Sequence, residues 1–275
     1  MKFCIAMKLV RKIALLIPVY ENQDGLEISL RTLPNEIPLD VVVVDDGSTP
    51  PIRLPEPPDP HRVFLLRLEE NQGIEHALNY GLVWIMEQGY EYVARLDAGD
   101  VALPRRFARQ LDFLEAHPEY ALVGGQVRFV DRNGREVFRE SFPTNYEDIR
   151  RAMHARNCFI HPTVMIRTEA LKVVGLYSDR FKAAEDYELF FRIARRFRVA
   201  NLQEYVTQCE VNPGGISLSK RRRQVLSRLK VMMFYFDPLK KESWLGLIKN
   251  IALLLVPVAW VHKIKRVLEN RRGWL

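Results

Sequence analysis

Three groups of carboxylates stand out as side chains that could act together, and they are Asp45-Asp46, Asp97 with Asp100, and Glu185-Asp186. The first two groups follow apolar runs, as residues at the carboxyl ends of buried strands do. Carboxylates that share one face repel one another unless a cation or a donor-rich ligand lies between them. A single acidic pair after a strand commonly caps a turn or a helix, but three groups on one face predict a site for a divalent metal, a nucleoside or both.

The second group carries its own turn signal. Ala98 and Gly99 separate Asp97 from Asp100 and let the chain turn, so we expect these two carboxylates to point the same way. Hard oxygen ligands with open positions suit Mg²⁺ or Mn²⁺ that holds a diphosphate. The expected cofactor is therefore Mn²⁺ or Mg²⁺, held by Asp97 and Asp100.

These groups need a scaffold that brings strand ends together. Apolar runs without alternation predict strands buried on both faces of a parallel sheet, over residues 13–20, 39–44, 63–68 and 92–96. Helices are predicted over 26–33 and 73–87, and six prolines between Pro50 and Pro60 predict an extended loop. This order predicts an α/β fold with a mostly parallel, doubly wound sheet and a ligand site at the carboxyl ends of the strands.

The second half of the chain mixes both types of element. Helices are predicted over 104–116, 146–155, 169–174 and 186–195, a hairpin over 123–129 and 136–138, and strands over 163–166 and 205–211. The pattern shows no internal repeat. We therefore expect one domain over residues 1–215.

Composition fits a globular protein with a basic end. The chain has 275 residues, 48% of them hydrophobic and 27% charged, which is enough for a sizeable core. The net charge of +7 is uneven, because residues 216–275 hold 14 basic and 3 acidic side chains while residues 1–215 hold 27 and 31. Basic residues interleaved with apolar ones at one end favour an anionic membrane surface as a partner and argue against nucleic acid.

The cysteines and the N-terminus indicate the compartment. Cys4, Cys158 and Cys209 are widely spaced and odd in number, which indicates neither a disulfide framework nor a zinc cluster. Charges interrupt the apolar N-terminus and no small-residue cleavage site follows, so a secretory signal is not expected. We expect a cytoplasmic protein that lies peripherally at the inner face of the cell membrane.

Residues 216–275 predict a separate helical tail that is basic and apolar. Its first part has apolar residues at helical spacing with basic residues between them. The stretch Trp244–Val261 is apolar except for Lys249 and Asn250, which leaves it at the margin of a membrane span. A helix that lies in the membrane interface fits better. The alternative is a hairpin buried against the domain.

Six segments in order make the chain resemble a known family. They are IPVYEN (17–22), VVDDGST (43–49), NQGIEHALNYGL (71–82), ARLDAGDVALPRRFARQ (94–110), HPTVMIR (161–167) and AEDYELFFRI (184–193). The chain resembles the family 2 glycosyltransferases, inverting enzymes of the GT-A fold that use nucleotide-diphosphate sugars. The resemblance covers about residues 13–217. It implies a Rossmann-like GT-A fold and transfer of a sugar to an acceptor hydroxyl.

The resemblance also assigns roles to positions. It implies that the nucleotide is bound by Pro18, Tyr20, Asp45, Asp46, Asn71, Gly73, Asn79, Arg95 and Asp97. It implies that Asp186 is the general base, with Glu185 as a supporting or acceptor-binding group. His161 could contact the acceptor or a metal, but a histidine before a proline at a strand edge is more often a structural hydrogen-bonding group.

Three positions depart from the family pattern. The usual acidic motif has carboxylates two residues apart, but here the residue two after Asp97 is Gly99. Glu21 follows the motif tyrosine, where many relatives have asparagine. Asn212 stands in the region where many relatives have a histidine. These departures predict weak or altered metal dependence.

The resemblance leaves the substrates partly open. A UDP-linked donor is favoured over GDP- and dTDP-sugars, and the expected acceptor is a lipid-linked saccharide of a surface polysaccharide. Two alternatives are a GT-A-like nucleotide-binding module without transferase activity and a glycoside hydrolase that uses a carboxylate pair.

Overall fold

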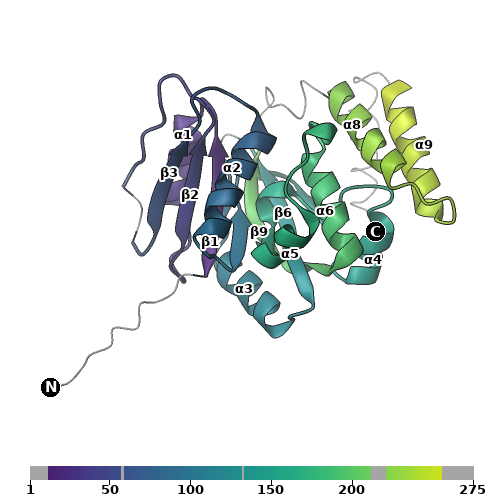
Figure 1. Cartoon of the computed structure of the whole chain (residues 1–275), viewed down its shortest axis with the longest axis horizontal. Helices are drawn as coiled ribbons and strands as arrows, with labels where there is room; N and C mark the ends of the chain where they lie inside the picture. The colour runs from purple at the N-terminus through teal and green to yellow at the C-terminus, as the bar shows by residue number, and fades with distance from the viewer. Residues whose placement is uncertain (1–11, 57–58, 132, 212–220, 256–275) are drawn as a thin grey trace.

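The structure is a computed structural model that describes residues 12–56, 59–131, 133–211 and 221–255 (Figure 1). Asn212 and the tail segments 216–220 and 256–275 lie outside the described residues. The described part contains one nine-stranded sheet in the order β3-β2-β1-β4-β8-β6-β9-β5, with β7 paired to β6.

The first four strands pair in parallel, as their apolar runs predict. They are β1 (Ile13–Val19), β2 (Asp40–Asp45), β3 (Arg62–Arg67) and β4 (Tyr92–Arg95). The strand order changes direction at β1 and β4, and in such sheets ligands bind beyond the carboxyl ends of the strands at this point. Asp45 and Asp46 lie at the end of β2, and Asp97 lies just after β4.

The second half of the sheet is mixed. Its strands are β5 (Val101–Ala102), β6 (Tyr120–Val130), β7 (Glu136–Glu140), β8 (Met165–Arg167) and β9 (Arg198–Glu210). Among the described residues four strand pairs are parallel and four are antiparallel. The strand predicted over 205–211 begins earlier, because residues from Arg198 onward pair with β6.

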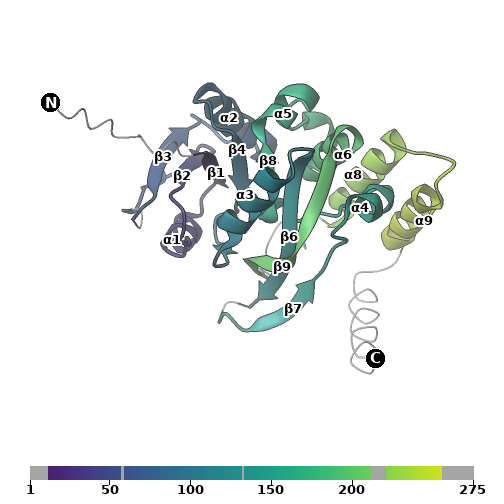
Figure 2. The ribbon, with the colours of Figure 1, turned by 90° about the horizontal axis from the view of Figure 1, so that it is seen from below.

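Helices cover both faces of the sheet (Figure 2). One face carries α1 (Gln23–Arg31) and α3 (Arg106–Ala116), and the other carries α2 (Ile74–Glu87), α5 (Thr168–Val174) and α6 (Glu185–Arg196). Side chains of β1 alternate between the two layers, since Leu15 packs in the cluster with α1 and Leu16 in the cluster with α2. The doubly wound arrangement therefore follows from strands that are apolar on both faces.

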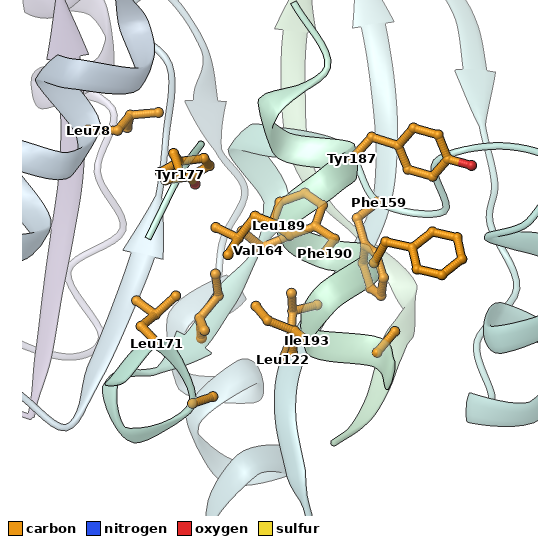
Figure 3. Packing of buried hydrophobic residues seen from close by; sticks show 14 of the residues in the cluster. Leu78, Leu122, Phe159, Val164, Leu171, Tyr177, Tyr187, Leu189, Phe190 and Ile193 are labelled. Carbon is orange, nitrogen blue, oxygen red and sulfur yellow. The ribbon is translucent and has the colours of Figure 1, made fainter. Parts of the chain in front are cut away.

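Helix α6 is fixed by its apolar side. Leu189, Phe190 and Ile193 are buried and belong to the cluster that also holds Leu122 and Val164 (Figure 3). This packing sets the position of the first turn of α6, which carries Glu185 and Asp186.

The C-terminal helices pack against this same body. They are α8 (Arg221–Phe234) and α9 (Lys241–Leu255), and α4 (Tyr146–Ala152) lies beside them (Figures 1 and 2). After α8, the Tyr235 ring stacks on Phe191 of α6 at 4.3 Å and 3°, and its hydroxyl donates to Glu188 Oε1 over 2.7 Å. Helix α8 and Tyr235, both beyond the expected boundary at residue 215, thus contribute side chains to the core. No helix within the described ranges is long and apolar enough to cross a membrane.

Candidate functional site

The first two acidic residues shape the loop that follows β2. Asp45 is fully buried, and it accepts hydrogen bonds from the backbone N–H groups of Ser48 over 2.9 Å and Ile52 over 3.2 Å. The Arg67 guanidinium lies 3.7 Å from the same carboxylate. Asp45 therefore holds its own loop in place beneath the surface of the site.

Asp46 links this loop to the start of α2. Its two oxygens accept the backbone N–H groups of Gln72 over 2.8 Å and Gly73 over 3.0 Å. Gly47 makes the approach possible, because its φ is +72° and an added Cβ would lie 2.5 Å from the backbone nitrogen of Asn71. The loops after β2 and β3 are thereby joined into one wall.

The other predicted nucleotide residues fall into two kinds. Tyr20, just after β1, and Asn71, in the loop after β3, are exposed, so a ligand can reach them. Pro18 is buried within β1. The Asn79 side chain has a structural role, because its amide donates to the Tyr177 carbonyl and accepts the Tyr177 N–H, each over 2.9 Å. Asn79 thus ties α2 to the segment before α6.

The turn between Asp97 and Asp100 is built as its glycine predicts. The Asp100 N–H donates to the Asp97 carbonyl over 3.0 Å, and Gly99 has a φ of +107°. Ser29 of α1 secures the turn, since its hydroxyl donates to the Asp100 carbonyl over 2.8 Å and accepts the Gly99 N–H over 2.9 Å. The position of this acidic turn is therefore set by α1.

The two carboxyls of this turn have different surroundings. The side chain of Asp97 is 43% exposed and lies 2.5 Å from the Arg95 guanidinium. Burial acts to raise its pKa, but Arg95 and His161 hold the pKa of Asp97 below its usual range. Asp100 is buried and accepts the Cys209 thiol over 3.2 Å, and burial together with the charge of Asp97 raises the pKa of Asp100 to about 8.

The donor set therefore fits a metal held through Asp97 alone. Among the described residues no group of three or more His, Cys, Asp or Glu side chains is arranged to hold a metal ion. Mg²⁺ and similar ions are commonly bound by one or two carboxylates together with substrate phosphates. Asp97 offers such a carboxylate, while Asp100 faces Cys209 and gives no support to its predicted role as a ligand.

The third acidic group lies at the first turn of α6. Asn157 donates its side-chain amide to Asp186 Oδ2 over 3.0 Å. Burial raises the pKa of Asp186, the Arg228 guanidinium of α8 opposes this rise, and the charge of Asp97 adds to it. Asp97 and Asp186 therefore lie within electrostatic reach of each other, although 89 residues separate them in sequence.

Glu185 beside it is buried, and its Oε2 atom has no hydrogen-bond partner within the described residues. Burial and then the charge of Asp186 raise the pKa of Glu185 to about 7. An unpaired buried carboxyl oxygen is costly unless a ligand supplies a donor. Glu185 Oε2 can thus accept a hydrogen bond from a ligand.

A histidine and a tyrosine lie within electrostatic reach of the acidic groups. His161 Nε2 and the Tyr177 hydroxyl lie 2.7 Å apart and share a hydrogen bond. Burial, with the nearby Arg95 charge, lowers the pKa of His161 to about 3, so the ring is neutral. Burial raises the pKa of Tyr177, and the charges of Asp186, Glu185 and Asp97 raise it further. The structural interpretation of His161 fits these contacts.

Several residues of the site carry no signal in the sequence. Ser29, Asn157 and Tyr177 bond to partners 70, 29 and 98 residues away in the chain, and Asn157 stands in no recognisable motif. Arg106 is also buried; it donates to the Arg95 carbonyl over 2.6 Å and to the Thr207 hydroxyl over 2.9 Å. Arg106 lies in the segment 94–110 of the sequence, but its inward orientation becomes apparent only in the fold.

Comparison with protein families and curated proteins points to one group. A family model described as Glycosyl transferase family 2 matches residues 14–175. The chain is 33% identical over 163 residues to an uncharacterized glycosyltransferase of Haemophilus influenzae, covering 58% of this chain and 58% of that protein's length. It is 31% identical over 195 residues to the amylovoran biosynthesis glycosyltransferase AmsE of Erwinia amylovora, covering 70% of each.

Solved structures share the fold. The mannosyltransferase PcManGT from Pyrobaculum calidifontis, in complex with GDP-Man and Mn²⁺, superposes with a TM-score of 0.60 at 20% identity, covering 92% of this chain and 72% of that one. S. aureus TarS 1–349 in complex with UDP gives a TM-score of 0.59 at 18% identity, covering 87% and 70%. These similarities confirm the expected GT-A architecture.

Proposed function

The chain belongs to glycosyl transferase family 2, and on that premise we propose that it is an inverting glycosyltransferase that moves a sugar from a nucleotide-diphosphate donor to an acceptor hydroxyl. The observation that supports the proposal is that Asp97, just after β4, and Asp186, at the start of α6, interact electrostatically, since the charge of Asp97 raises the pKa of Asp186. An inverting transfer needs one leaving-group site and one base on opposite sides of the reacting carbon.

Asp186 is the proposed base. The acceptor hydroxyl attacks the anomeric carbon of the donor, the bond from that carbon to the diphosphate breaks, and Asp186 takes the hydroxyl proton. The Asn157 amide orients the carboxylate, and Glu185 Oε2 accepts a second hydroxyl of the acceptor. The nucleoside diphosphate leaves with the electron pair of the broken bond.

Asp97 is the proposed ligand of a divalent metal, Mn²⁺ or Mg²⁺. Such an ion neutralises the charge that develops on a departing diphosphate. Arg95 holds the Asp97 carboxylate in place at 2.5 Å and contributes a positive charge beneath it. PcManGT was solved with Mn²⁺, which supports the same class of ion for this chain.

The proposed nucleoside pocket is the wall formed by the loops after β1, β2 and β3. Tyr20 and Asn71 contact the nucleoside, while Asp46 retains lone pairs that can accept from the base or ribose. Pro18, Asp45, Gly73 and Asn79 shape the wall. A UDP-linked donor is favoured, since TarS was solved with UDP, and the GDP-Man complex of PcManGT makes GDP-sugars the alternative.

The proposed acceptor is a lipid-linked saccharide of a surface polysaccharide. The relative AmsE is named for amylovoran biosynthesis, which supports a role in polysaccharide synthesis. The basic and apolar C-terminal region would hold the protein peripherally at the inner face of the cell membrane, close to such an acceptor.

The test is donor turnover by the purified full-length chain. A panel of UDP-, GDP- and dTDP-sugars with Mn²⁺ is first screened by thermal stabilisation, because a ligand that binds the native state raises the melting temperature. We expect one UDP-sugar to stabilise the protein and to release UDP when a saccharide acceptor is added. UDP binding with no turnover of any donor would indicate a binding module, and cleavage of glycosides without nucleotide would indicate a hydrolase.

A further inference from the structure

Helix α9 packs against the protein with its small and polar side. Ser243, Gly246 and Asn250 are buried, and Asn250 donates to the Gly246 carbonyl over 2.9 Å. A Cβ added at Gly246 would lie 2.7 Å from the Ala155 Cα and 2.8 Å from the His154 carbonyl oxygen. This side of α9 is therefore fitted closely to the turn after α4 and to α8, beside which it lies in Figure 1.

The opposite side of α9 is apolar and exposed. We define the outer face of α9 as a set of side chains that are each 49% to 78% exposed: Trp244, Leu245, Ile248, Ile251 and Leu255. Their spacing places them along one side of the helix. A surface helix of a globular protein normally shows the reverse pattern, and exposed apolar patches of this kind mark interaction surfaces.

A cavity of about 410 Å³ lies between α4, α6 and the turn that joins α8 to α9. Its lining carries three cations, Arg150, Arg195 and Lys240, against one carboxylate, Asp237. Two of these cations have carboxylate partners, since Lys240 lies 3.5 Å from Asp237 Oδ2 and Arg150 lies 3.1 Å from Glu147. Arg195 pairs with no carboxylate among the described residues, and this cation makes the cavity suited to an anionic ligand.

The cavity adjoins the outer face of α9. Phe236 lines the cavity, and its ring meets the Trp244 ring edge-on at 4.9 Å. The Trp244 indole N–H donates to the carbonyl of Pro238, another lining residue, over 3.1 Å. A cationic pocket and an apolar helix face therefore form one continuous surface.

This surface is separate from the candidate active site. Arg195 lies near the end of α6, whereas Asp186 lies in its first turn. Nine residues of helix separate them, which is about 13 Å along the helix axis. Neither the nucleotide nor the diphosphate leaving group is expected at this distance.

We propose that the cavity binds the phosphate headgroup of an anionic membrane lipid while the outer face of α9 lies among the lipid chains of the interface, an inference that rests on the membrane association proposed above. Charge complementarity supports this occupant, because Lys241 and Lys249 on α9 add to the cations of the cavity. A second copy of the chain is the less suitable occupant. A two-fold interface would bring the same cationic surface of both copies together.

The experiment measures co-sedimentation of the full-length protein with phosphatidylcholine vesicles, with and without phosphatidylglycerol. The wild-type protein is expected to bind the vesicles that contain phosphatidylglycerol more tightly. Arg150→Gln with Arg195→Gln should weaken that binding about thirtyfold, because each cation near an anionic leaflet contributes about 1 kcal/mol to the binding free energy. Binding to phosphatidylcholine should stay unchanged. Ile248→Gln with Ile251→Gln should weaken binding to both kinds of vesicle by about tenfold or more.

The matched control is Val173→Gln on α5, which also replaces an exposed apolar side chain, 64% exposed, and should leave vesicle binding unchanged. Thermal melting confirms that each variant is folded. Retention of the phosphatidylglycerol preference by the arginine variant would overturn the headgroup site. An isoleucine variant that changes self-association in light scattering, and not vesicle binding, would assign the outer face to a second copy.

The inference can fail independently of the proposed function. UDP release from the donor is measured in the same preparations without vesicles. A protein that turns over the donor but does not bind vesicles overturns only the lipid surface, and one that binds vesicles as expected without turnover overturns only the transferase proposal.

Discussion

Asn157 donates its side-chain amide to Oδ2 of Asp186 over 3.0 Å, and this contact fixes the carboxylate that we propose as the base. Asn157 comes from the loop after α4, so the base is oriented by a segment outside its own helix. A hydrogen bond to a charged group is worth about 1.5 to 3 kcal/mol. Asn157 is thus a positioning residue whose effect on catalysis can be measured.

We expect Asn157→Ala to lower kcat about tenfold to a hundredfold, because the carboxylate loses the donor that orients and stabilises it. Affinity for UDP should stay unchanged, since the contact lies away from the proposed nucleoside wall. The acidic limb of the pH–rate profile should also move to higher pH, since the charged form of Asp186 loses a donor. An unchanged kcat, or an equal loss of UDP affinity, would show that Asn157 has another role.

Replacing the base itself should have a larger effect. Asp186→Asn keeps the size of the side chain but cannot accept the proton of the acceptor hydroxyl, so transfer should be abolished. Calorimetric affinity for UDP should stay nearly intact. Parallel loss of transfer and of UDP binding would mean that Asp186 belongs to the nucleotide pocket and that the base lies elsewhere.

The pH dependence of transfer should report the raised pKa of Asp186. Burial raises this pKa, so the carboxyl is protonated at a higher pH than an ordinary aspartate. A base must be deprotonated to act; activity should therefore be present above the raised pKa and be lost as the pH falls through it. Measurement of kcat against pH should place the acidic limb above the usual range of an aspartate, and a limb within that range would contradict the assignment.

The sheet and its first helices could be predicted from the sequence because they depend on local patterns. The runs that became β1, β2 and β4 are buried on both faces, and the observed bounds of all four strands lie within a few residues of the predicted ones. The expected burial is wrong for β3, because this strand lies at the edge of the sheet and its residues are exposed or half-buried. Gly99 likewise indicated the acidic turn, since its positive φ needs glycine. Such features require no knowledge of distant partners.

Side-chain orientations in the site could not be predicted in the same way. Asp100 turns inward because its partner is Cys209, and Asn79 is occupied because its partner is Tyr177; these partners lie about a hundred residues away in the chain. Nothing near Asp100 in the sequence distinguishes it from Asp97. The basic pattern of the α8 sequence likewise did not predict that α8 packs on α6 through Tyr235.

The different surroundings of Asp97 and Asp100 predict different effects on metal dependence. Asp97→Asn should weaken the apparent affinity for Mn²⁺ in the transfer assay by about tenfold or more, because it removes the proposed ligand. Asp100→Asn should leave that affinity unchanged, since the buried carboxyl accepts the Cys209 thiol. Equal losses in the two variants would restore Asp100 as a ligand.

Tyr235 should contribute to the stability of the whole body, because it joins α8 to α6. Tyr235→Phe keeps the ring stacked on Phe191 but removes the hydrogen bond to Glu188, which should lower the free energy of unfolding by about 1 to 3 kcal/mol. Tyr235→Ala also removes the buried ring and should cost about 3 to 5 kcal/mol in urea unfolding. Met233→Ala is the matched control, since Met233 is 66% exposed on α8 and its loss should change stability little. If all three variants unfold at the wild-type urea concentration, α8 folds as a tail apart from the domain, and the docking of α8 on the helix that carries Asp186 is contradicted.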